Sequence, residues 1–428
     1  LGPFSGVGRL GPFSGVGGLG PFSRGEAMPD FQQPGALASS AAFQTYGHPS
    51  GLASGALATM AAPHLDELAE VLTHGVDGVT GTSVLRDAPI SPLTSLKIGG
   101  VARLLVRASR PHEIAAVANA ASAHGVPTLV LGGGSNVIVA DEGFDGLVIK
   151  LEAASTTRHA GTIADAAADG SFRPDVALVD VEAGCQTAGF ARWAARQGLA
   201  GIEWACGIPG TIGGAVAGNA GAYGGDMAGI VTAVQTWLPP GPSPLWGTSP
   251  VSVGAPGTVT TISGDAMGYG YRTSRLKRGP GVVLGARLRL HREDPAAILA
   301  RIDTYEAARR QKQPTERSCG SVFRNPPGEI AGRLLEAAGM KGRSSGDASV
   351  SPVHANWIIN RGNATASDVV SLIREGQASV RARTGIRLQL EVLLLGGWDA
   401  RVLNDLAGEA EGMARVASAG DTTIGADL

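Results

Sequence analysis

The chain has 428 residues, with 35 lysine and arginine residues against 37 aspartate and glutamate residues, which gives a formal net charge of −2. This length allows two or three domains with a sizeable core, and the near-neutral charge argues against a nucleic-acid partner. The three cysteines, Cys185, Cys206 and Cys319, have no metal-ligand spacing and are not an even set for disulfides, and no apolar run could span a bilayer. We therefore expect a cytoplasmic protein without a metal site and without a membrane partner.

The N-terminal segment repeats with a period of nine residues, as LGPFSGVGR, LGPFSGVGG and LGPFSRGEA. Two matches to the G-x-G-x-x-G dinucleotide fingerprint lie in it, at residues 6–11 and 15–20. Prolines flank both matches, so neither follows a predicted strand or opens a helix, and we give them no functional weight. Residues 1–63 are predicted to be a disordered or variable leader, and ordered structure is expected to begin near His64.

Hydrophobic periodicity predicts alternating helices and strands in the next part of the chain. In chain order these are a helix at 65–72, a strand at 103–109, a helix at 112–125, a strand at 126–131 and a strand at 146–151. The strand at 126–131 runs into three glycines, Ser135 and Asn136. Consecutive glycines at a strand end can present backbone amides to a pyrophosphate, although a tight strand-to-loop turn would use the same residues.

A glycine-rich stretch at residues 201–224, GIEWACGIPGTIGGAVAGNAGAYG, follows a predicted helix at 187–198. Eight glycines alternate there with small apolar side chains, and no charged residue follows Glu203. Such backbone packs closely either against a large flat ligand or against a neighbouring part of the fold. Residues 153–174 and 239–256 lack periodicity and are predicted surface insertions, and a strand is expected at 282–290.

Residues 295–398 form another block of alternating elements, which predicts a separate α+β domain. The expected elements are helices at 295–312 and 329–339, a strand at 354–360, a helix from 365 to about 383 and a strand at 387–396. Thr365 and Asp368 form a capping box before the last helix. GRSSG at 342–346 matches the serine-hydrolase elbow, but no helix is expected after it, so we regard that match as chance. The residues after Trp398 are predicted to be a weakly ordered tail.

Three polar residues stand in settings that could carry chemistry. Arg272 is flanked by two tyrosines and a glycine, which can hold a guanidinium in one direction, whereas an isolated arginine is most often a solvated surface residue. Ser321 follows a glycine before a short strand, where a turn hydroxyl is the usual explanation. Glu391 shares a strand face with Gln389 and Leu393, so a partly buried carboxylate and a solvated face both remain possible.

Eight motifs in order resemble one known family, the UDP-N-acetylenolpyruvoylglucosamine reductases, also called UDP-N-acetylmuramate dehydrogenases. The motifs are TSLKIGG, VLGGGSNVIVAD, GLAGIEWACGIPGTIGGAVAGNAGAYG, YGYRTSRLK, CGSVFRNP, AGRLLEAAGMKG, HANWIINRGNATASDV and GIRLQLEV, and they cover about residues 93–396. Only 49 positions separate Arg272 from Ser321, which resembles the family's shorter class. That class lacks the loop that places a tyrosine on the substrate diphosphate, so the diphosphate ligands of this chain stay open.

The resemblance implies an α+β fold. A two-lobed FAD-binding domain of the vanillyl-alcohol-oxidase (PCMH) type is expected over residues 64–292, with lobes at about 64–152 and 175–292. A C-terminal α+β substrate-binding domain follows at 295–398, and 399–428 is the tail. It also implies an oxidoreductase of peptidoglycan precursor synthesis, which uses FAD and NADPH to reduce the UDP-sugar UDP-N-acetylglucosamine enolpyruvate to UDP-N-acetylmuramate. We expect a monomer.

Residue roles follow from the same resemblance. Arg272 would stabilise the enolate-like intermediate, Ser321 would donate a proton to it, and Glu391 would be the second acidic catalytic residue. Contacts with the substrate are expected from Arg324 and Asn325. Contacts with FAD are expected from Gly132, Gly133, Gly134, Ser135, Asn136, Gly207, Ile208, Pro209, Gly210, Gly213, Gly214, Asn219 and Gly221. The alternatives are an FAD-dependent oxidase on the same fold and a non-catalytic nucleotide-binding protein.

Overall fold

The computed structural model describes residues 54–77, 79, 83–152, 175–240, 256–279 and 281–407. Most of the predicted leader, the insertion at 153–174, most of the insertion at 239–256 and the tail from residue 408 lie outside these residues. The predictions made for those segments are therefore not addressed by the structure.

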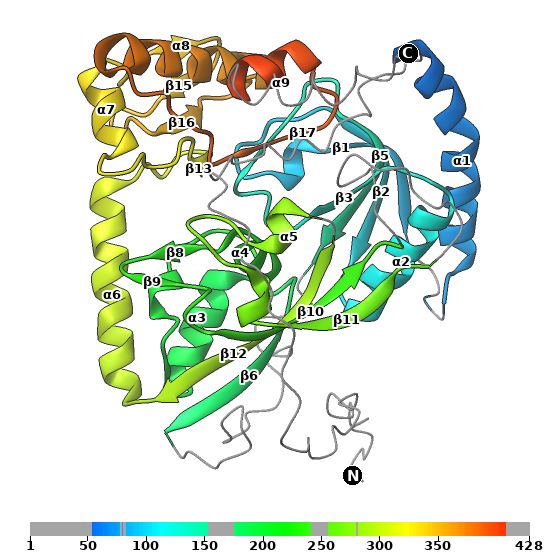
Figure 1. Cartoon of the computed structure of the whole chain (residues 1–428), viewed down its shortest axis with the longest axis horizontal. Coiled ribbons are helices and arrows are strands. Elements are labelled where there is room, and N and C mark those ends of the chain that lie inside the picture. The colour runs from blue at the N-terminus through cyan, green and yellow to red at the C-terminus, as the bar shows by residue number, and fades with distance from the viewer. Residues whose placement is uncertain are drawn as a thin grey trace, which may run out of the picture. The chain divides into compact units, whose positions relative to one another are not determined.

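The first sheet has the strand order β1-β2-β5-β3 and lies beside α1 and α2 (Figure 1). Strands β2, β5 and β3 run parallel, and β1 pairs with β2 in the antiparallel direction. The bounds are β1 Val84–Pro89, β2 Val101–Ala108, β3 Thr128–Leu131 and β5 Phe144–Leu151. Helix α2 (Pro111–Ala123) connects β2 to β3, which confirms the predicted βαβ unit.

Helix α1 (Ser54–His74) begins ten residues before the predicted start at His64. The alanine-rich sequence SGALATMAA has high helix propensity, which local hydrophobic periodicity did not reveal. Leu65, Leu68 and Leu72 are buried at i, i+3 and i+7, as expected for one face of a helix packed on a core.

The second sheet is antiparallel, with the strand order β11-β10-β12-β6, and β7 also pairs with β12. The bounds are β6 Val176–Glu182, β7 Leu199–Ala200, β10 Val231–Leu238, β11 Thr258–Ser263 and β12 Val282–Arg292. The predicted strand at 282–290 and the predicted helix at 187–198 are confirmed, the helix as α3 (Thr187–Arg196). One core cluster contains buried residues of both sheets, among them Leu104, Leu147, Val179 and Leu288.

The glycine-rich stretch contains a short helix, α4 (Ile212–Gly218), that the sequence did not predict. The Thr211 side chain caps its N-terminus by accepting a hydrogen bond from the amide of Gly214. Asn219 ends it in the left-handed conformation, with φ 46°. The remaining short elements of this part are β8 Gly221–Ala222, β9 Gly225–Asp226, α5 Arg275–Arg278 and the 3₁₀ turns Ser91–Leu93, Glu203–Ala205 and Asp265–Met267.

Helix α6 (Pro295–Lys312) runs along one side of Figure 1, from the end of β12 to the C-terminal block. That block has an antiparallel sheet in the order β13-β16-β15-β14, packed with α7, α8 and α9 (Ala400–Ala407). The bounds are β13 Ser318–Ser321, α7 Ala331–Ala337, β14 Ser344–Ser345, β15 Ala348–Val350, β16 Trp357–Asn360 and α8 Ala366–Thr384. The capping box of Thr365 and Asp368 is confirmed. GRSSG enters the β14–β15 pair rather than a strand-to-helix turn, so it is not a nucleophile elbow.

Two predictions near the C-terminus differ in part from the structure. The expected strand at 387–396 reduces to β17 (Leu393–Leu395), which pairs in parallel with β4 (Val137–Val139). The residues before it alternate in burial, but their pairing with the segment after β13 is limited to an isolated antiparallel bridge between Phe323 and Leu390, so they form no continuous ladder. The expected weak tail contains α9 (Ala400–Ala407), whose Leu406 is 1% exposed because it packs into the core of the C-terminal block.

Side-chain contacts fasten the C-terminal block to the first sheet region. The carboxylate of Asp141 accepts hydrogen bonds from the first two amides of α8, at Ala366 (2.7 Å) and Ser367 (3.0 Å). The buried amide of Asn360 donates to the carbonyl of Leu96 at 2.9 Å. Together with the β17–β4 pair, these contacts hold the segments that carry Ser321 and Glu391 next to the glycine loop at 132–136.

Candidate active site

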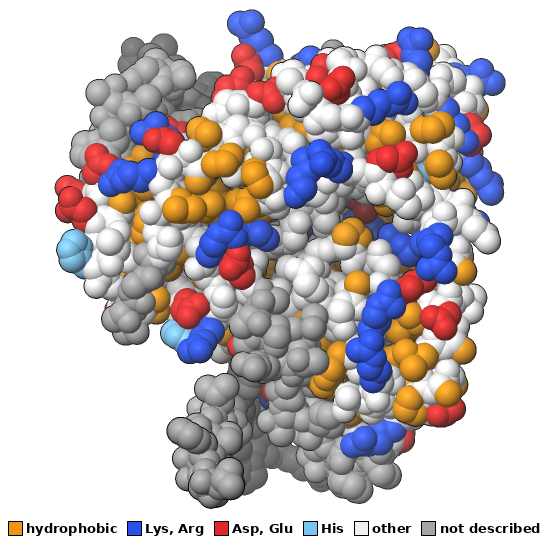
Figure 2. All heavy atoms as spheres, turned by 180° about the vertical axis from the view of Figure 1, so that it is seen from behind, with side chains coloured by type: hydrophobic (Ala, Val, Ile, Leu, Met, Phe, Trp, Pro, Cys, Tyr) orange, Lys and Arg blue, Asp and Glu red, His pale blue; other side chains and the backbone are white. Residues whose placement is uncertain are grey.

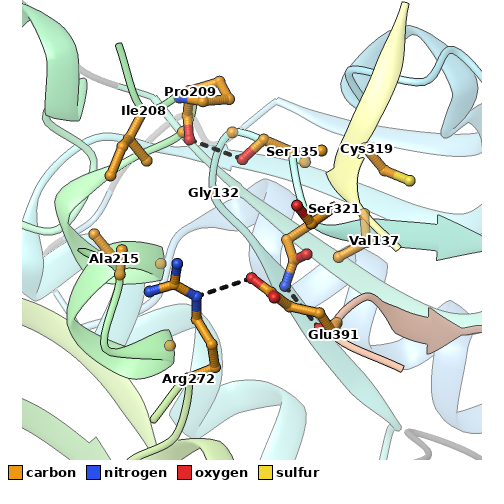
Figure 3. A pocket seen from close by; sticks show the side chains of 18 of the residues that line it. Gly132, Ser135, Val137, Ile208, Pro209, Ala215, Arg272, Cys319, Ser321 and Glu391 are labelled. Carbon is orange, nitrogen blue, oxygen red and sulfur yellow. Dashed lines mark hydrogen bonds and ion pairs between the residues drawn. The ribbon is translucent and has the colours of Figure 1, made fainter. Parts of the chain in front are cut away.

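A cavity of about 660 Å³ lies where the loops of both sheets meet the C-terminal block (Figure 3). Its walls come from the glycine loop after β3, from the glycine-rich stretch around α4, from α6 and from the segments that precede α7 and β17. Ten of the thirteen predicted FAD-contacting residues line it: Gly132, Gly133, Gly134, Ser135, Asn136, Ile208, Pro209, Gly210, Gly214 and Gly221.

The two glycine segments touch each other at the cavity wall, which explains why side chains are excluded there. A Cβ on Gly133 would lie 2.4 Å from the Cα of Gly210, and a Cβ on Gly132 would lie 2.4 Å from the Oγ1 of Thr211. The hydroxyl of Ser135 donates to the carbonyl of Pro209 at 3.0 Å. Close packing is therefore confirmed for these glycines, and the same residues also line the cavity. Their contact with a ligand stays a prediction.

The backbone of the glycine loop fits an anionic group. Within the described part of the chain, the amide N–H groups of Gly133, Gly134, Ser135 and Asn136 have no hydrogen-bond acceptor. Four consecutive unpaired amides beside a cavity suit the pyrophosphate of a dinucleotide cofactor. The ammonium of Lys150 donates to the carbonyl of Gly132 and thereby supports the loop from behind.

Three predicted FAD contacts do not line the cavity. Gly207 packs under α6, where a Cβ would lie 2.2 Å from the Cδ of Arg309. Gly213 packs α4 against the segment after β6, with its amide donating to the carbonyl of Ala183 at 2.9 Å. The side chain of Asn219 is buried and donates to the carbonyl of Gly270 at 3.0 Å. Their direct contact with FAD stays a prediction.

Arg272 lies in a tight turn and reaches into the cavity (Figure 3). Its Nε donates to the Oε1 of Glu391 at 3.0 Å, and its Nη2 donates to the carbonyl of Gly221 at 2.9 Å. The guanidinium also lies 5.3 Å from the centre of the Tyr271 ring, which adds a cation–π contact. The alternative of a freely solvated arginine is therefore wrong.

Glu391 is a partly buried carboxylate, not part of a solvated face. Its side chain is 15% exposed, and its carbonyl accepts a hydrogen bond from the side-chain amide of Asn136 at 3.2 Å. Burial raises the pKa of Glu391 above its ordinary value, although the nearby cations of Arg272, Lys277 and Arg324 act in the opposite direction. A carboxyl group in this environment holds a proton more readily than a solvated glutamate.

Ser321 ends strand β13 and lines the same cavity. The neighbouring backbone is fixed because the buried Asn356 accepts from the amide of Phe323 at 2.9 Å and donates to its carbonyl at 2.8 Å. Among the described residues, the Ser321 hydroxyl has no hydrogen-bond partner, and it is therefore available to a ligand. The structure thus brings Arg272 and Glu391 into contact and places Ser321 on the wall of the same cavity.

The two predicted substrate contacts lie outside the cavity wall. The side chain of Asn325 caps α7 by accepting from the amide of Ala331 at 3.1 Å. The Nε of Arg324 is buried without a hydrogen-bond partner in the described residues. Contact of either side chain with a substrate stays a prediction.

The sequence reasoning missed several cavity residues with charge or aromatic character. Lys277 lines the cavity five positions after Arg272, and burial and the Arg324 charge lower its pKa to about 8. On α6, Arg309 and Lys312 line the cavity, and neither has an ion pair among the described residues, since Glu306 of the same helix pairs with Arg192 and Arg310. Tyr223 lines the cavity and stacks on Tyr305 with ring centres 4.2 Å apart. The sequence did hold a signal for these residues, because the spacing of Tyr305, Arg309 and Lys312 places them on one face of the predicted helix.

The described residues were also considered for a membrane-spanning helix and for a metal site. None of their helices is long and apolar enough to cross a membrane. No three or more of their His, Cys, Asp and Glu side chains are arranged to hold a metal ion.

Comparison with known proteins identifies both halves of the chain. Residues 102–241 match the FAD binding domain model, and residues 312–395 match the model of the UDP-N-acetylenolpyruvoylglucosamine reductase C-terminal domain. These matches confirm the α+β fold class, with an FAD-binding part followed by a C-terminal domain of the reductase type. The FAD requirement predicted from the resemblance agrees with the free amides of the glycine loop.

This chain aligns with nearly the whole length of several relatives whose names are known. The UDP-N-acetylenolpyruvoylglucosamine reductase of Chloroflexus aggregans is 41% identical over 312 residues, which are 72% of this chain and 96% of the relative. That of Rubrobacter xylanophilus is 40% identical and is covered to 94%. The crystal structure of the same reductase from Thermus caldophilus is 32% identical, with a TM-score of 0.55 over 73% of this chain and 98% of the other. The chain therefore belongs to the UDP-N-acetylenolpyruvoylglucosamine reductase family.

Proposed function

We propose that this chain is a flavoenzyme that reduces UDP-N-acetylglucosamine enolpyruvate to UDP-N-acetylmuramate, with NADPH as the reductant and FAD as the bound cofactor. The observation that carries the proposal is the Arg272–Glu391 pair, at 3.0 Å, in a cavity walled by the two glycine segments and by Ser321. This arrangement combines a dinucleotide cradle with a fixed cation, a partly buried carboxyl group and a hydroxyl group.

The residues present fit FAD. The unpaired amides of Gly133, Gly134, Ser135 and Asn136 would hold its pyrophosphate, and Gly210 on the same wall has no side chain that would occupy the cavity. When bound, FAD supplies the hydride chemistry that no protein side chain can supply. The protein contributes binding, orientation and electrostatics.

Arg272 stabilises the charge that the reaction creates. When hydride adds to the methylene carbon of the enolpyruvyl group, negative charge develops on the adjacent carbon and on its carboxylate. A guanidinium that is already oriented by Glu391 and by the Gly221 carbonyl needs no reorganisation to meet that charge. The cation therefore lowers the energy of the enolate-like state.

Ser321 and Glu391 are the candidate proton donors to that carbanionic carbon. The Ser321 hydroxyl has no partner among the described residues and can donate to the substrate, while the intermediate is basic enough to accept from a weak acid. Glu391 has a raised pKa because it is buried, which favours a proton-holding carboxyl group beside Arg272. We assign Ser321 as the donor and Glu391 as the second acidic group.

The cations of α6 suit the diphosphate of the substrate. Arg309 and Lys312 line the cavity without an acidic partner in the described part of the chain. An anionic ligand would supply the missing counter-charge, because a partly desolvated guanidinium without a partner is costly. We therefore assign the contact with the substrate diphosphate to these two residues, because the shorter class lacks the loop that places a tyrosine on it.

One assay tests the proposed function. The purified protein should be yellow and should consume NADPH only when UDP-N-acetylglucosamine enolpyruvate is present. A colourless protein that takes up no FAD would contradict the cofactor assignment. A yellow protein whose NADPH consumption depends on oxygen and not on the sugar nucleotide would favour an oxidase instead.

The setting of the enzyme is part of the proposal. We expect it to act in the cytoplasm as a monomer and to bind no nucleic acid. Positive and negative side chains are interspersed over the face in Figure 2, without a continuous basic field of the kind that nucleic acids require. Light scattering after size-exclusion chromatography would test the monomer, and a second mass at twice the chain mass would contradict it.

A further inference from the structure

The turn that carries Arg272 has an unfavourable backbone conformation. Gly270 and Thr273 exchange two backbone hydrogen bonds, of 3.0 and 3.1 Å, so Tyr271 and Arg272 occupy the two central positions of a tight turn. Arg272 has φ 56°, in the left-handed region that glycine normally fills at this position. A side chain at such a position persists only when its surroundings hold it there.

Lys277 supplies one of the contacts that hold this turn. Its Nζ donates to the carbonyl of Arg272 at 3.0 Å, so the lysine side chain reaches back over the turn that precedes its own helix, α5. The helix itself is anchored, because the hydroxyl of Ser274 donates to the carbonyl of Ala217 at 2.7 Å and accepts from the amide of Lys277. Ser274 therefore fixes α5 against α4, and the ammonium of Lys277 connects this fixed helix to the carbonyl of Arg272.

The surroundings of Lys277 differ from those of an ordinary surface lysine. It is half-buried and lines the cavity. The charged groups that act on it are Arg272 in the turn, Arg324 after β13 and Glu391 before β17. Helix α4, which packs against α5, carries no charged residue. Burial, Arg324 and Arg272 lower the pKa of Lys277 to about 8, although Glu391 opposes the shift. A lysine in this position loses its charge within the working range of most enzymes.

We infer that Lys277 is a positioning residue, whose ammonium holds the carbonyl of Arg272 and thereby keeps the left-handed turn that aims the guanidinium at Glu391 and the cavity. This inference rests on the proposed function, since Arg272 serves the step that reduces the sugar nucleotide. Lys277 acts through Arg272 and takes no part in flavin reduction by NADPH. It differs in this way from a lysine that binds either substrate.

Two variants separate positioning from space filling. Lys277→Met keeps the apolar stem but removes the ammonium, and we expect kcat for the sugar nucleotide to fall by ~10- to 100-fold, as for a displaced catalytic group. The KM for that substrate should stay within about twofold, because the lost contact matters mainly in the transition state. Lys277→Arg, which can donate to the same carbonyl, should recover kcat to within about fivefold of wild type.

The pH profile gives a readout that a purely structural lysine would not change. Wild-type kcat should fall on the alkaline side near pH 8, where Lys277 loses its charge and the remaining neutral amine becomes a weaker donor to the carbonyl of Arg272. In Lys277→Arg this limb should disappear, because a guanidinium stays protonated throughout the range. Arg275→Gln is the matched control: Arg275 is an exposed cation on the same short helix, and its removal should leave kcat and the alkaline limb unchanged.

Bound FAD, the thermal midpoint and the rate of flavin reduction by NADPH are measured for each variant. The inference is overturned if Lys277→Met has wild-type kcat, if it loses flavin reduction as much as sugar-nucleotide turnover, or if Lys277→Arg keeps the alkaline limb. Equal loss in Arg275→Gln would also overturn it, because the effect would then belong to the charge of the helix. If wild-type protein fails to turn over the sugar nucleotide, the proposed function fails, and this result is seen before any variant is compared.

Discussion

The Nε of Arg272 and the Oε1 of Glu391 lie 3.0 Å apart, although 119 positions separate the two residues in the chain. Arg272 comes from a turn before α5, and Glu391 comes from the extended segment that leads into β17. The pair therefore joins the region of the second sheet to the C-terminal block at the cavity wall. Its two members meet only when both parts of the fold are correctly placed.

We expect Glu391→Gln to bind FAD normally but to lose ~10²- to 10⁴-fold in kcat, the range for a lost acid–base group. Glutamine keeps an acceptor for the Nε of Arg272, so the turn should stay in place. Steady-state turnover of the sugar nucleotide and single-turnover reduction by NADPH measure the two half-reactions separately. Equal loss in both would contradict a role for Glu391 in the second step.

Glu391→Gln should also change how the stability of the protein depends on pH. Burial raises the pKa of Glu391 above its ordinary value of 4.5, so the folded state binds this proton more tightly than the unfolded state does. The resulting cost to stability is absent below pH 4.5, grows as pH rises through the raised pKa and then stays constant. Glu391→Gln should therefore equal wild type in urea unfolding near pH 4 and be at least as stable at pH 7. Lower stability at pH 7 would contradict the direction of the shift.

Ser321→Ala should remove the proton donor without disturbing the FAD site. The serine hydroxyl makes no hydrogen bond within the described residues, so its loss leaves no unsatisfied partner in the protein. We expect flavin reduction by NADPH at the wild-type rate and ~10²-fold or slower turnover of the sugar nucleotide. Stopped-flow absorbance of the flavin measures both steps, and loss of the first step would show that the assigned role is wrong.

Local elements could be predicted from the sequence because their signals are local. The capping box of Thr365 and Asp368 marked the start of α8, and the apolar periodicity of α2 marked the helix of the βαβ unit. The alternating burial around Glu391 was also correct. The strand expected at 387–396 formed only at its end, as β17, because alternating burial reports the environment of side chains and not a hydrogen-bonded ladder.

Contacts between residues far apart in the chain could not be predicted from local sequence patterns. Nothing in the pattern around Arg272 showed that it would meet Glu391, or that Lys277 would reach back to its carbonyl. The touching of Gly133 and Gly210 likewise depends on how two loops pack. The family resemblance supplied the catalytic residues, but their geometry came only from the folded chain.

Gly133→Ala should impair FAD binding more than the fold as a whole. The new Cβ would lie 2.4 Å from the Cα of Gly210, so both loops must move apart, at a cost of about 1–3 kcal/mol for overpacking. We expect a lower ratio of bound FAD to protein, measured by absorbance. Gly229→Ala is the control, because its Cβ meets nothing closer than 3.7 Å and lies outside the cavity. Equal FAD content in both variants would contradict the prediction.

Arg309→Gln should weaken binding of the sugar nucleotide without changing FAD content. One charge-assisted hydrogen bond to a phosphate contributes about 1.5–3 kcal/mol, which corresponds to a rise in KM of ~10- to 100-fold. The effect should be smaller at high salt, since wild-type binding is then screened as well. Arg310→Gln is the matched control on the same helix, because Arg310 pairs with Glu306 and does not line the cavity. An unchanged KM in Arg309→Gln would remove Arg309 from the diphosphate site.

Asp141→Ala should cost more activity than stability, because Asp141 binds the N-terminus of α8 from the side of the first sheet. Its carboxylate accepts from the amides of Ala366 and Ser367 and from the Ser367 hydroxyl, at 2.7–3.0 Å. Loss of such a cap costs about 1 kcal/mol. The larger consequence is that the C-terminal block is less firmly held, and Glu391 then meets Arg272 less often.

The comparison that decides this last prediction uses a second cap of the same helix. Thr365→Ala removes the hydroxyl that accepts from the amide of Asp368, a contact confined to the C-terminal block. Both variants should therefore lose about 1 kcal/mol in urea unfolding. Only Asp141→Ala should also lower kcat for the sugar nucleotide. Equal kcat values would mean that the Asp141 contact stabilises α8 without setting the position of the Arg272–Glu391 pair.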